Sequence, residues 1–158
     1  MAHPHAHLIE HFYTAFQKLD GATMAACYAP DAVFTDPAFG TLHGDEIGAM
    51  WSMLTRRAEE FSLTFSNVQA DDTQGSADWV AIYRFSQTGR KVTNRVKARF
   101  TFKDGRFATH VDEFDLHRWA SQALGMKGLL LGWAPPVQRA MNQKARASLA
   151  SFREKQRA

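Results

Sequence analysis

The chain has 158 residues, of which 45% are apolar and 22% are charged, so it can bury one sizeable core and is too short for two full domains. Its net charge of +3 is unevenly distributed, because residues 134–158 hold six of the 19 Lys and Arg residues and one of the 16 Asp and Glu residues. The remaining body is slightly acidic and contains no recognised nucleic-acid-binding motif. We therefore do not expect a nucleic-acid partner.

Cysteine content and hydropathy predict the compartment. The single cysteine, Cys27, cannot form a disulfide within the chain, so an oxidising environment is not needed. The N-terminus has neither the cationic start nor the apolar stretch of a secretory signal. Apolar runs such as residues 129–131 are far shorter than the roughly 20 residues that span a bilayer. We therefore expect a soluble, cytoplasmic protein.

Helical periodicity dominates the first third of the chain. Apolar residues at helical spacing predict an amphipathic helix over residues 8–19. Asp20 is suited to cap a short second helix over residues 22–28. A short strand is expected at 32–37, and a third helix with one buried face at 44–58.

After Phe61 the periodicity changes from helical to alternating. Gly-containing turns separate the alternating segments, and Asp104-Gly105 favours a tight hairpin because both positions tolerate positive φ angles. Three helices followed by antiparallel strands predict an α+β domain with its helices on one face of the sheet. The four expected strands are residues 63–68, 79–87, 91–103 and 106–116.

Side-chain alternation assigns faces to the two longest strands. In residues 91–103 it places Asn94 among the apolar residues of the core face. Burying an amide without a partner costs roughly 1–3 kcal/mol, so Asn94 is expected to find a partner or to border a wet cavity. In residues 106–116 alternation alone is ambiguous, because one face carries His110 and Asp112 and the other carries Val111.

Three groups of residues follow one another in a characteristic order: Phe12–Phe16 with Tyr28–Pro37, the helix after Leu42-His43-Gly44, and Val111–Asp115. In order and spacing they resemble the nuclear transport factor 2-like superfamily, in its SnoaL-like and ketosteroid isomerase-like branch. The resemblance implies a cone: a curved, antiparallel-rich sheet, or cystatin-like roll, wrapped around the N-terminal helices with a pocket at its open end. Many members are homodimers, so a homodimer is expected.

The resemblance covers residues 8–117 and divides the chain into three parts. Residues 1–7 are expected to be a flexible N-terminus, and residues 8–117 to form the SnoaL-like cone domain. Residues 118–158 are expected to form a C-terminal helical extension that is basic from residue 134.

The resemblance also implies roles for acidic residues. Asp36 matches the general base of the family's ketosteroid isomerases. Asp112 matches an acidic residue on the last strand of its SnoaL-like cyclases and epoxide hydrolases, which favours the orientation that places His110 and Asp112 in the pocket.

Two specific activities of the family are disfavoured. The oxyanion donors of the isomerases fall at Phe12 and Ala98 in this chain, although Tyr13 is adjacent to the first position. The arginine of the epoxide hydrolases has Arg99 as its candidate, but alternation places this side chain on the face opposite to Asn94.

The sharpest hypothesis is a pocket in which Asp36, His110 and Asp112 supply acid and base groups. An apolar cavity raises the pKa of a carboxylate, and an imidazole titrates near neutrality. Asn94 and Tyr83 would orient a substrate oxygen, and aromatic side chains would form walls suited to a cyclic ligand. The residues expected to bind substrate are Tyr13, Phe34, Phe39, Trp51, Tyr83 and Asn94.

Ordinary structural roles remain open for the same residues. Asp36 precedes Pro37 and is a common type of turn residue. His110 and Asp112 form an i, i+2 pair that also suits an exposed sheet face. The aromatic residues also suit the core, since 12 Phe and four Trp must be buried somewhere.

No cofactor or metal is expected. The chain has no nucleotide-binding glycine loop. His3, His5, His7 and His11 crowd the N-terminus, and His7 and His11 have helical i, i+4 spacing. Because three of the four lie in a segment expected to fray, they predict adventitious metal binding rather than a catalytic site.

The last 25 residues predict a basic amphipathic helix, with an apolar residue about every four positions. Docking on its own domain is favoured over contact with an anionic membrane or an acidic partner. The apolar residues that precede it predict a hinge or a lid over the pocket: Trp119, Leu124, Met126, Leu129–Leu131 and Trp133.

The sequence thus predicts a small-molecule pocket protein that binds or transforms a hydrophobic metabolite. If it is an enzyme, cofactor-independent acid/base chemistry of the isomerase, cyclase or hydratase type fits best. The alternative is a non-catalytic module of the same fold for ligand binding or protein association, because a fold does not determine a function.

Overall fold

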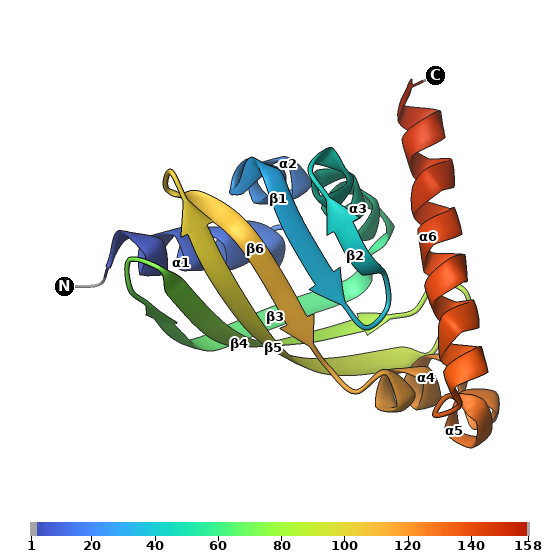
Figure 1. Ribbon diagram of the computed structural model, residues 1–158. Helices are drawn as coiled ribbons and strands as arrows, with labels where there is room; N and C mark the ends of the chain where they lie inside the picture. The colour runs from blue at the N-terminus through green and yellow to red at the C-terminus, as the bar shows by residue number, and fades with distance from the viewer. Residues whose placement is uncertain (1–2, 158) are drawn as a thin grey trace.

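The fold is α+β, as predicted, and the computed structural model describes residues 3–157 (Figure 1). Six strands form one mixed sheet in the order β2-β1-β6-β5-β4-β3. The strands are β1 (Tyr28–Asp36), β2 (Gly40–His43), β3 (Glu59–Ala70), β4 (Gln74–Arg84), β5 (Lys91–Lys103) and β6 (Arg106–Glu113). The helices are α1 (Pro4–Gln17), α2 (Gly21–Ala26), α3 (Asp45–Arg57), α4 (Leu116–Leu124), α5 (Met126–Leu131) and α6 (Pro135–Arg157).

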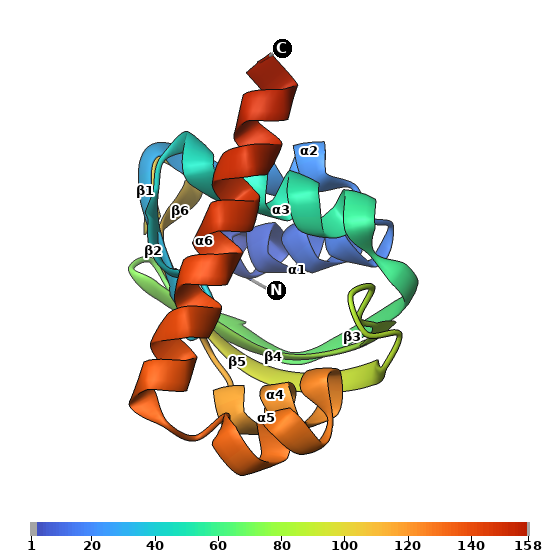
Figure 2. The same cartoon turned by 90° about the vertical axis from the view of Figure 1, so that its right-hand side faces the viewer.

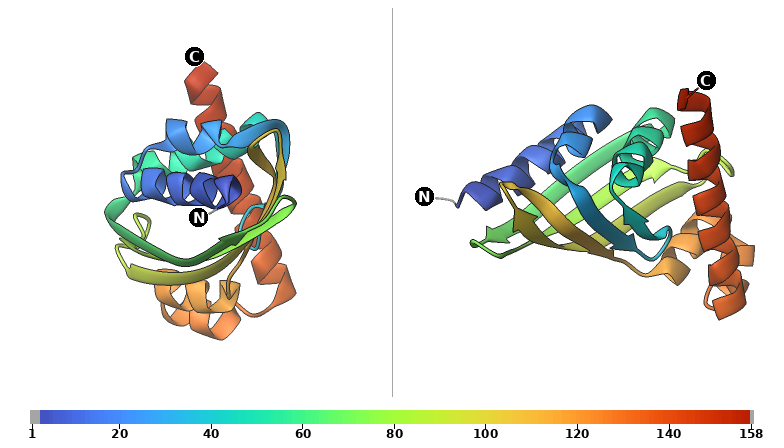
Figure 3. Two further views of the ribbon diagram at one scale, coloured as in Figure 1. Left: turned by 90° about the vertical axis from the view of Figure 1, so that its left-hand side faces the viewer. Right: turned by 45° about the horizontal axis from the view of Figure 1, so that its top comes forward.

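The N-terminal helix lies inside the curve of the sheet (Figure 3). Its apolar residues recur at helical spacing, so Ile9, Phe12 and Phe16 are buried against the strands. α1 begins at Pro4 instead of the predicted Leu8, because the His3 side chain accepts a hydrogen bond from the His5 N–H and proline suits the first helical turn. Part of the segment expected to be flexible is therefore helical, and residues 1–2 lie outside the described residues.

Strand β6 occupies a central position that the sequence did not predict. It pairs antiparallel with β5, as expected, and parallel with β1. Because both of its edges are paired, its inward side chains are deep in the molecule. His110 lies between Phe34 of β1 and Phe100 of β5 in the register, and Asp112 lies opposite Ala98. The ambiguity of face in this strand is thereby settled: His110 is fully buried and Asp112 is 3% exposed.

The C-terminal helix α6 crosses the open end of the curved sheet (Figure 2). It is docked on its own domain, since Leu149 and Phe152 are buried and Arg153 pairs with Asp45 and Glu46 of α3. None of the helices in residues 3–157 combines the length and the apolarity that crossing a bilayer requires.

The apolar lid predicted before α6 is wrong. Five of its seven residues, Met126, Leu129–Leu131 and Trp133, are exposed to solvent instead of covering the interior. The physical reason is the small-residue face of this segment: Gly128 and Gly132 are buried against α4, so the large side chains point outward.

Candidate active site

The inward face of β6 carries a chain of hydrogen bonds that ends on a carboxylate. Trp51 Nε1 donates to the hydroxyl of Tyr28 over 2.9 Å, and that hydroxyl lies 2.7 Å from His110 Nδ1. On the other side of the imidazole, His110 Nε2 lies 2.8 Å from Asp112 Oδ1. All four side chains are at most 6% exposed, so water competes little for these bonds.

The direction of the first bond follows from chemistry, because an indole nitrogen can only donate, so the Tyr28 oxygen accepts from Trp51. In the tautomer with its proton on Nε2, His110 donates to Asp112 and accepts the Tyr28 O–H at Nδ1. The chain therefore holds the imidazole in place and orients the Asp112 carboxylate.

Asp112 also receives a second, longer contact. Trp79 Nε1 lies 3.5 Å from the same oxygen, Oδ1. Both hydrogen-bond donors thus approach one carboxylate oxygen, and among the hydrogen bonds of residues 3–157 none involves Oδ2. This leaves Oδ2 as the atom that is available to a ligand.

A buried hydroxyl without a partner lies in the same interior as this carboxylate. Tyr13 of α1 is fully buried, and among the described residues its hydroxyl is the one buried side-chain polar atom that lacks a hydrogen bond. Burial raises the pKa of Tyr13 well above its usual value, and the charge of Asp112 raises it further. The phenol therefore stays protonated and can donate to a bound oxygen atom.

Asp36 lies at the end of β1, in the turn to β2. Its carboxylate accepts the Phe39 N–H over 2.6 Å, so the expected turn role is present. Burial raises the pKa of Asp36 to about 7, and the charge of Asp112 adds to this shift against the opposing backbone hydrogen bonds from Phe39 and Ala38. The structure thus combines a turn residue with a carboxyl group that titrates near neutrality.

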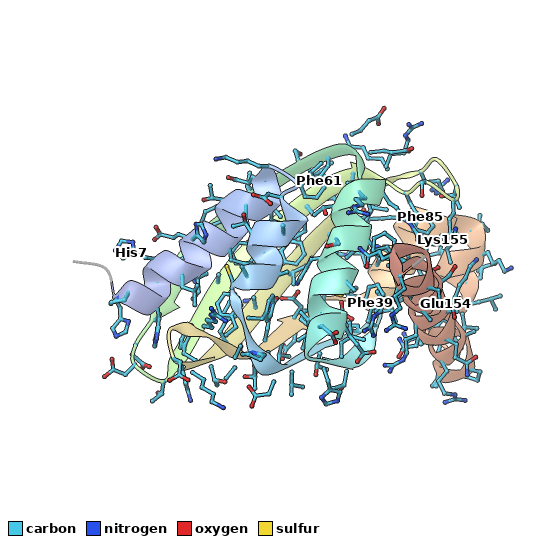
Figure 4. The ribbon with its side chains drawn as sticks, turned by 90° about the horizontal axis from the view of Figure 1, so that it is seen from above. His7, Phe39, Phe61, Phe85, Glu154 and Lys155 are labelled. Atoms are coloured by element: carbon cyan, nitrogen blue, oxygen red, sulfur yellow. The ribbon has the colours of Figure 1, made fainter. Side chains whose placement is uncertain are left out.

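Helix α6 holds this turn from outside. Asn142 Nδ2 donates to the carbonyl oxygens of Pro37 and Ala38 over 2.8 and 2.7 Å. Arg146 donates to the carbonyl oxygens of Phe39 and Thr41. Figure 4 shows the buried Phe39 between α3 and α6. The position of Asp36 therefore depends on the docked C-terminal helix.

The other predicted site residues lie at different places on the inward face. Phe34 and Trp51 surround His110, with the Phe34 ring 5.0 Å from the imidazole, centroid to centroid. Tyr83 accepts a hydrogen bond from Trp119 Nε1 over 2.8 Å. Asn94 is half-buried opposite Ala81, and no hydrogen bond of residues 3–157 involves its side chain. Tyr83 and Asn94 thus belong to the open end of the cone, away from His110.

Two hollows open at the surface near this end. The first, of about 470 Å³, lies between the Pro37 turn, Phe114 and the start of α6. The second, of about 670 Å³, is lined by Thr93, Arg95 and residues of α4. Neither is lined by Asp36, His110 or Asp112, and the 3% exposure of Asp112 shows that its carboxylate is covered in this conformation.

Sequence reasoning missed the role of Tyr28. Tyr28 reaches His110 because β1 pairs in parallel with β6, with an irregularity between Tyr28 and Val33. No local pattern shows such a pairing across about 80 residues. A buried histidine needs a hydrogen-bond partner for each ring nitrogen, so a second partner of His110 could be expected. The sequence does not indicate which residue supplies it.

Arg99 and the N-terminal histidines lie outside the site. Arg99 is 65% exposed and pairs with Glu113 on the outer face of the sheet, in agreement with its expected orientation. His3 interacts with Asp72. Within residues 3–157, no three His, Cys, Asp or Glu side chains are grouped as metal ligands.

Comparison with known proteins identifies the family. The SnoaL-like domain matches residues 9–110, which is more than half of the chain. The chain belongs to the SnoaL-like domain family. No curated protein matches it.

Several solved structures share the fold of this SnoaL-like chain. An NTF2-like protein of unknown function from Burkholderia pseudomallei has 20% identity and a TM-score of 0.67, over 77% of this chain and 98% of its own. An LEH-like epoxide hydrolase from M. tuberculosis has 21% identity and a TM-score of 0.64, over 84% and 96%. TerC, co-crystallized with polyporic acid, has 16% identity and a TM-score of 0.65, over 77% and 99%. These similarities establish the NTF2-like fold of the chain.

Proposed function

We propose that this SnoaL-like protein binds a small cyclic, hydrophobic molecule and moves a proton on it without a cofactor. The observation that carries the proposal is the unpartnered, buried hydroxyl of Tyr13, which shares the closed interior with the buried Asp112 carboxylate. One carbonyl compound can use both groups. The unpartnered hydroxyl would donate a hydrogen bond to the carbonyl oxygen, and the oriented carboxylate would accept a proton from the neighbouring carbon.

The proposed reaction is an isomerisation. Asp112 Oδ2 takes a proton from a carbon next to the carbonyl group, and the electrons of that C–H bond form a C=C bond. The carbonyl π electrons move to the oxygen, where the Tyr13 hydroxyl donates a hydrogen bond. In a β,γ-unsaturated ketone the electrons extend to the γ carbon, so return of the proton from Asp112 to that carbon restores the carbonyl group and shifts the C=C bond, and nothing is oxidised or reduced. Attack of the enolate carbon on a second carbonyl group would give the cyclase variant.

The remaining predicted residues support this chemistry in different ways. His110 would hold Asp112 in place through its hydrogen bond to Oδ1. Asp36, with a pKa of about 7, would supply a second group able to give or accept a proton at neutral pH. Tyr83 and Asn94 would orient the distal end of the ligand at the mouth of the cone, while Phe34, Phe39 and Trp51 would form apolar walls.

Access to Asp112 would require a local movement. We take the ring of Phe114, which lines the first hollow two residues after Asp112, as the group that must move. Displacement of Phe114 would join the hollow of about 470 Å³ to the interior. This volume is within the usual range for sites that hold small organic ligands.

Isotope exchange tests the proposal without knowledge of the natural substrate. A panel of cyclic ketones is incubated with the protein in D₂O, and NMR follows exchange of the C–H next to each carbonyl. Wild-type protein should accelerate exchange of at least one compound, and Asp112→Asn should reduce the rate by about 10²-fold or more. Tyr13→Phe should reduce it as well, whereas the exposed Arg99→Lys should not. Equal exchange by wild type and Asp112→Asn would refute the role of Asp112.

A non-catalytic binding module is the second candidate. The observation that favours it is the low exposure of Asp112, at 3%, in an interior filled by aromatic side chains. A binding module would show saturable ligand binding by calorimetry, with no exchange for any ligand that binds. Binding together with exchange supports the enzyme.

Two further expectations belong to this proposal. We expect a homodimer, as in many members of the superfamily, and light scattering of the purified chain would test it. A cytoplasmic location is the expectation from the single cysteine, Cys27, which is free and buried.

A further inference from the structure

Five large apolar side chains on and beside α5 face solvent. Met126 is 69% exposed, Leu130 61% and Trp133 64%, while Leu129 and Leu131 are about half exposed. We call residues 126–133 the apolar tip. It lies at the outer end of the molecule, below the sheet and next to the start of α6 (Figure 1).

The tip turns its glycines inward and its leucines outward, which reverses the usual arrangement of a soluble helix. Gly128 packs so closely on α4 that a Cβ at this position would lie 2.0 Å from the Ala120 carbonyl oxygen. Gly132 is also buried against Ala120. Replacement by larger residues would therefore push the segment off α4. The fold presents the apolar side chains as a fixed surface.

Hydrogen bonds also hold the tip in this orientation. His117 Nε2 of α4 lies 2.8 Å from the Leu129 carbonyl oxygen. Trp133 Nε1 donates to the Leu130 carbonyl oxygen over 3.0 Å, so the polar atom of the indole is satisfied while its ring stays exposed. The exposure thus belongs to an ordered segment, not to a frayed end.

The tip and the residues that flank it in sequence carry positive charges and no negative charge. Between Asp115 and Glu154 the sequence holds six basic residues and no acidic residue. Lys127 lies within the tip and is exposed. Arg118 of α4 and Arg139 of α6, on either side of the tip in sequence, are also exposed.

We propose that the apolar tip docks on the surface of an anionic lipid bilayer. Exposed leucines and a tryptophan beside cationic side chains form the combination that inserts at the boundary between headgroups and acyl chains. Lys127, Arg118 and Arg139 would meet the lipid phosphates, and the leucines would enter the apolar layer. This contact uses α5, whereas α6 stays docked on the cone through Leu149 and Phe152.

A second copy of the chain is a less suitable partner for the tip than an anionic bilayer. A symmetric dimer through this surface would place two like-charged Lys127 side chains, which repel each other, in one interface, because the same patch faces itself across a two-fold axis. No acidic residue within the tip would offset that repulsion. An anionic bilayer offers both an apolar layer and the opposite charge.

Vesicle sedimentation of the full chain tests the proposal. Vesicles of phosphatidylcholine alone are compared with vesicles that also contain phosphatidylglycerol. The wild type should bind the anionic vesicles more tightly, and added NaCl should weaken binding. Leu129→Ser with Leu130→Ser should lower affinity at least about tenfold, and Lys127→Glu should lower it for anionic vesicles alone. The matched control, Leu54→Ser on α3, should bind as the wild type does, since Leu54 is also exposed, at 37%.

A second measurement is independent of the stability of these variants. Brominated anionic lipids should quench part of the tryptophan fluorescence of the wild type, and Trp133→Phe should remove that part. Failure of the wild type to bind anionic vesicles would overturn the proposal. Equal binding to phosphatidylcholine alone would overturn the assignment to an anionic surface. A dimer that dissociates on Leu129→Ser, without vesicle binding, would assign the tip to a second copy instead.

Discussion

At the scale of single residues, Tyr28 holds two buried hydrogen bonds at once. Its oxygen accepts from Trp51 Nε1, and the same hydroxyl is hydrogen-bonded to His110 Nδ1. Removal of the hydroxyl would leave an indole N–H and an imidazole nitrogen without partners in a closed interior. Such groups lose the full free energy of their desolvation, which is about 1–3 kcal/mol each.

Tyr28→Phe should therefore destabilise the protein by about 2 kcal/mol or more, measured as the free energy of unfolding in urea. Tyr83→Phe is the matched control, because it also removes the acceptor of a tryptophan N–H, that of Trp119. Trp119 is only half-buried, so water can replace the lost partner and the expected loss is about 1 kcal/mol or less. Equal losses for the two variants would contradict the chain of bonds through His110.

Asp36 provides a prediction on pH. Its folded-state pKa of about 7 lies above the ordinary value of 3.8, so the folded state keeps a proton that the unfolded state has lost. The wild type should therefore lose stability as the pH rises from about 4 to 7.

Asp36→Asn removes this titration while it keeps an acceptor for the Phe39 N–H. The variant should be more stable than the wild type by roughly 2 kcal/mol at pH 8, which allows for the partial exposure of Asp36, and nearly equal to it at pH 4. Urea unfolding at both pH values gives the difference. A stability difference that does not change with pH would show that Asp36 titrates normally.

The predictability of the site from the sequence varied from residue to residue. Alternation and resemblance together gave the inward orientation of His110 and Asp112, because a strand fixes which side chains share a face. Tyr28 was missed, since its contact with His110 depends on a parallel pairing between distant strands. The orphaned hydroxyl of Tyr13 was equally invisible, because the absence of a partner is a property of the packed interior.

At the scale of elements, α6 acts as a brace on the β1–β2 turn. The Asn142 amide spans two successive carbonyl oxygens in that turn, and Arg146 binds two more. These bonds join segments that are more than 100 residues apart in sequence. The turn that carries Asp36 is therefore ordered in part by the C-terminus.

Asn142→Ala should lower the free energy of unfolding by about 1–2 kcal/mol, because it removes both bonds to the turn. It should also increase amide hydrogen exchange at residues 38–40. Gln143→Ala, at an exposed position on the same helix, is the control and should leave both quantities unchanged. Unchanged exchange in Asn142→Ala would mean that the turn holds its conformation without α6.

Elements with strong periodicity or a clear cap were predictable, the short α2 (Gly21–Ala26) among them, whereas other short elements were not. The expected bounds of strand 91–103 coincide with β5, and those of the third helix lie within one residue of α3. β2, with four residues, is too short for a pattern to develop. The apolar run before α6 was assigned to a lid because hydrophobicity alone does not show that the glycines take the inward face.

At the scale of the whole molecule, the cone and its C-terminal helix share a core. Leu149 and Phe152 of α6 are buried in the same apolar cluster as α1, α3 and the strands. α6 is thus part of the folding unit rather than an attached tail.

A chain that ends at Ala134 should remain folded, because α1 and the six strands keep their mutual contacts, but it should lose several kcal/mol of stability. It should also bind more of a hydrophobic dye, since the surface beneath Leu149 and Phe152 becomes exposed. Circular dichroism in urea and dye fluorescence measure the two effects. Stability equal to that of the full chain would contradict the docking of α6.

The parallel pairing of β1 with β6 determines when the candidate active site can form during synthesis. Asp36 leaves the ribosome long before His110 and Asp112. β2 can pair with one edge of β1 early, but the other edge stays open until β6 has emerged. Until then the sheet that covers the aromatic faces of α1 and α3 is incomplete. Contacts between such distant residues form slowly, so the nascent chain passes through an interval in which its most apolar surfaces are open to chaperones and to one another.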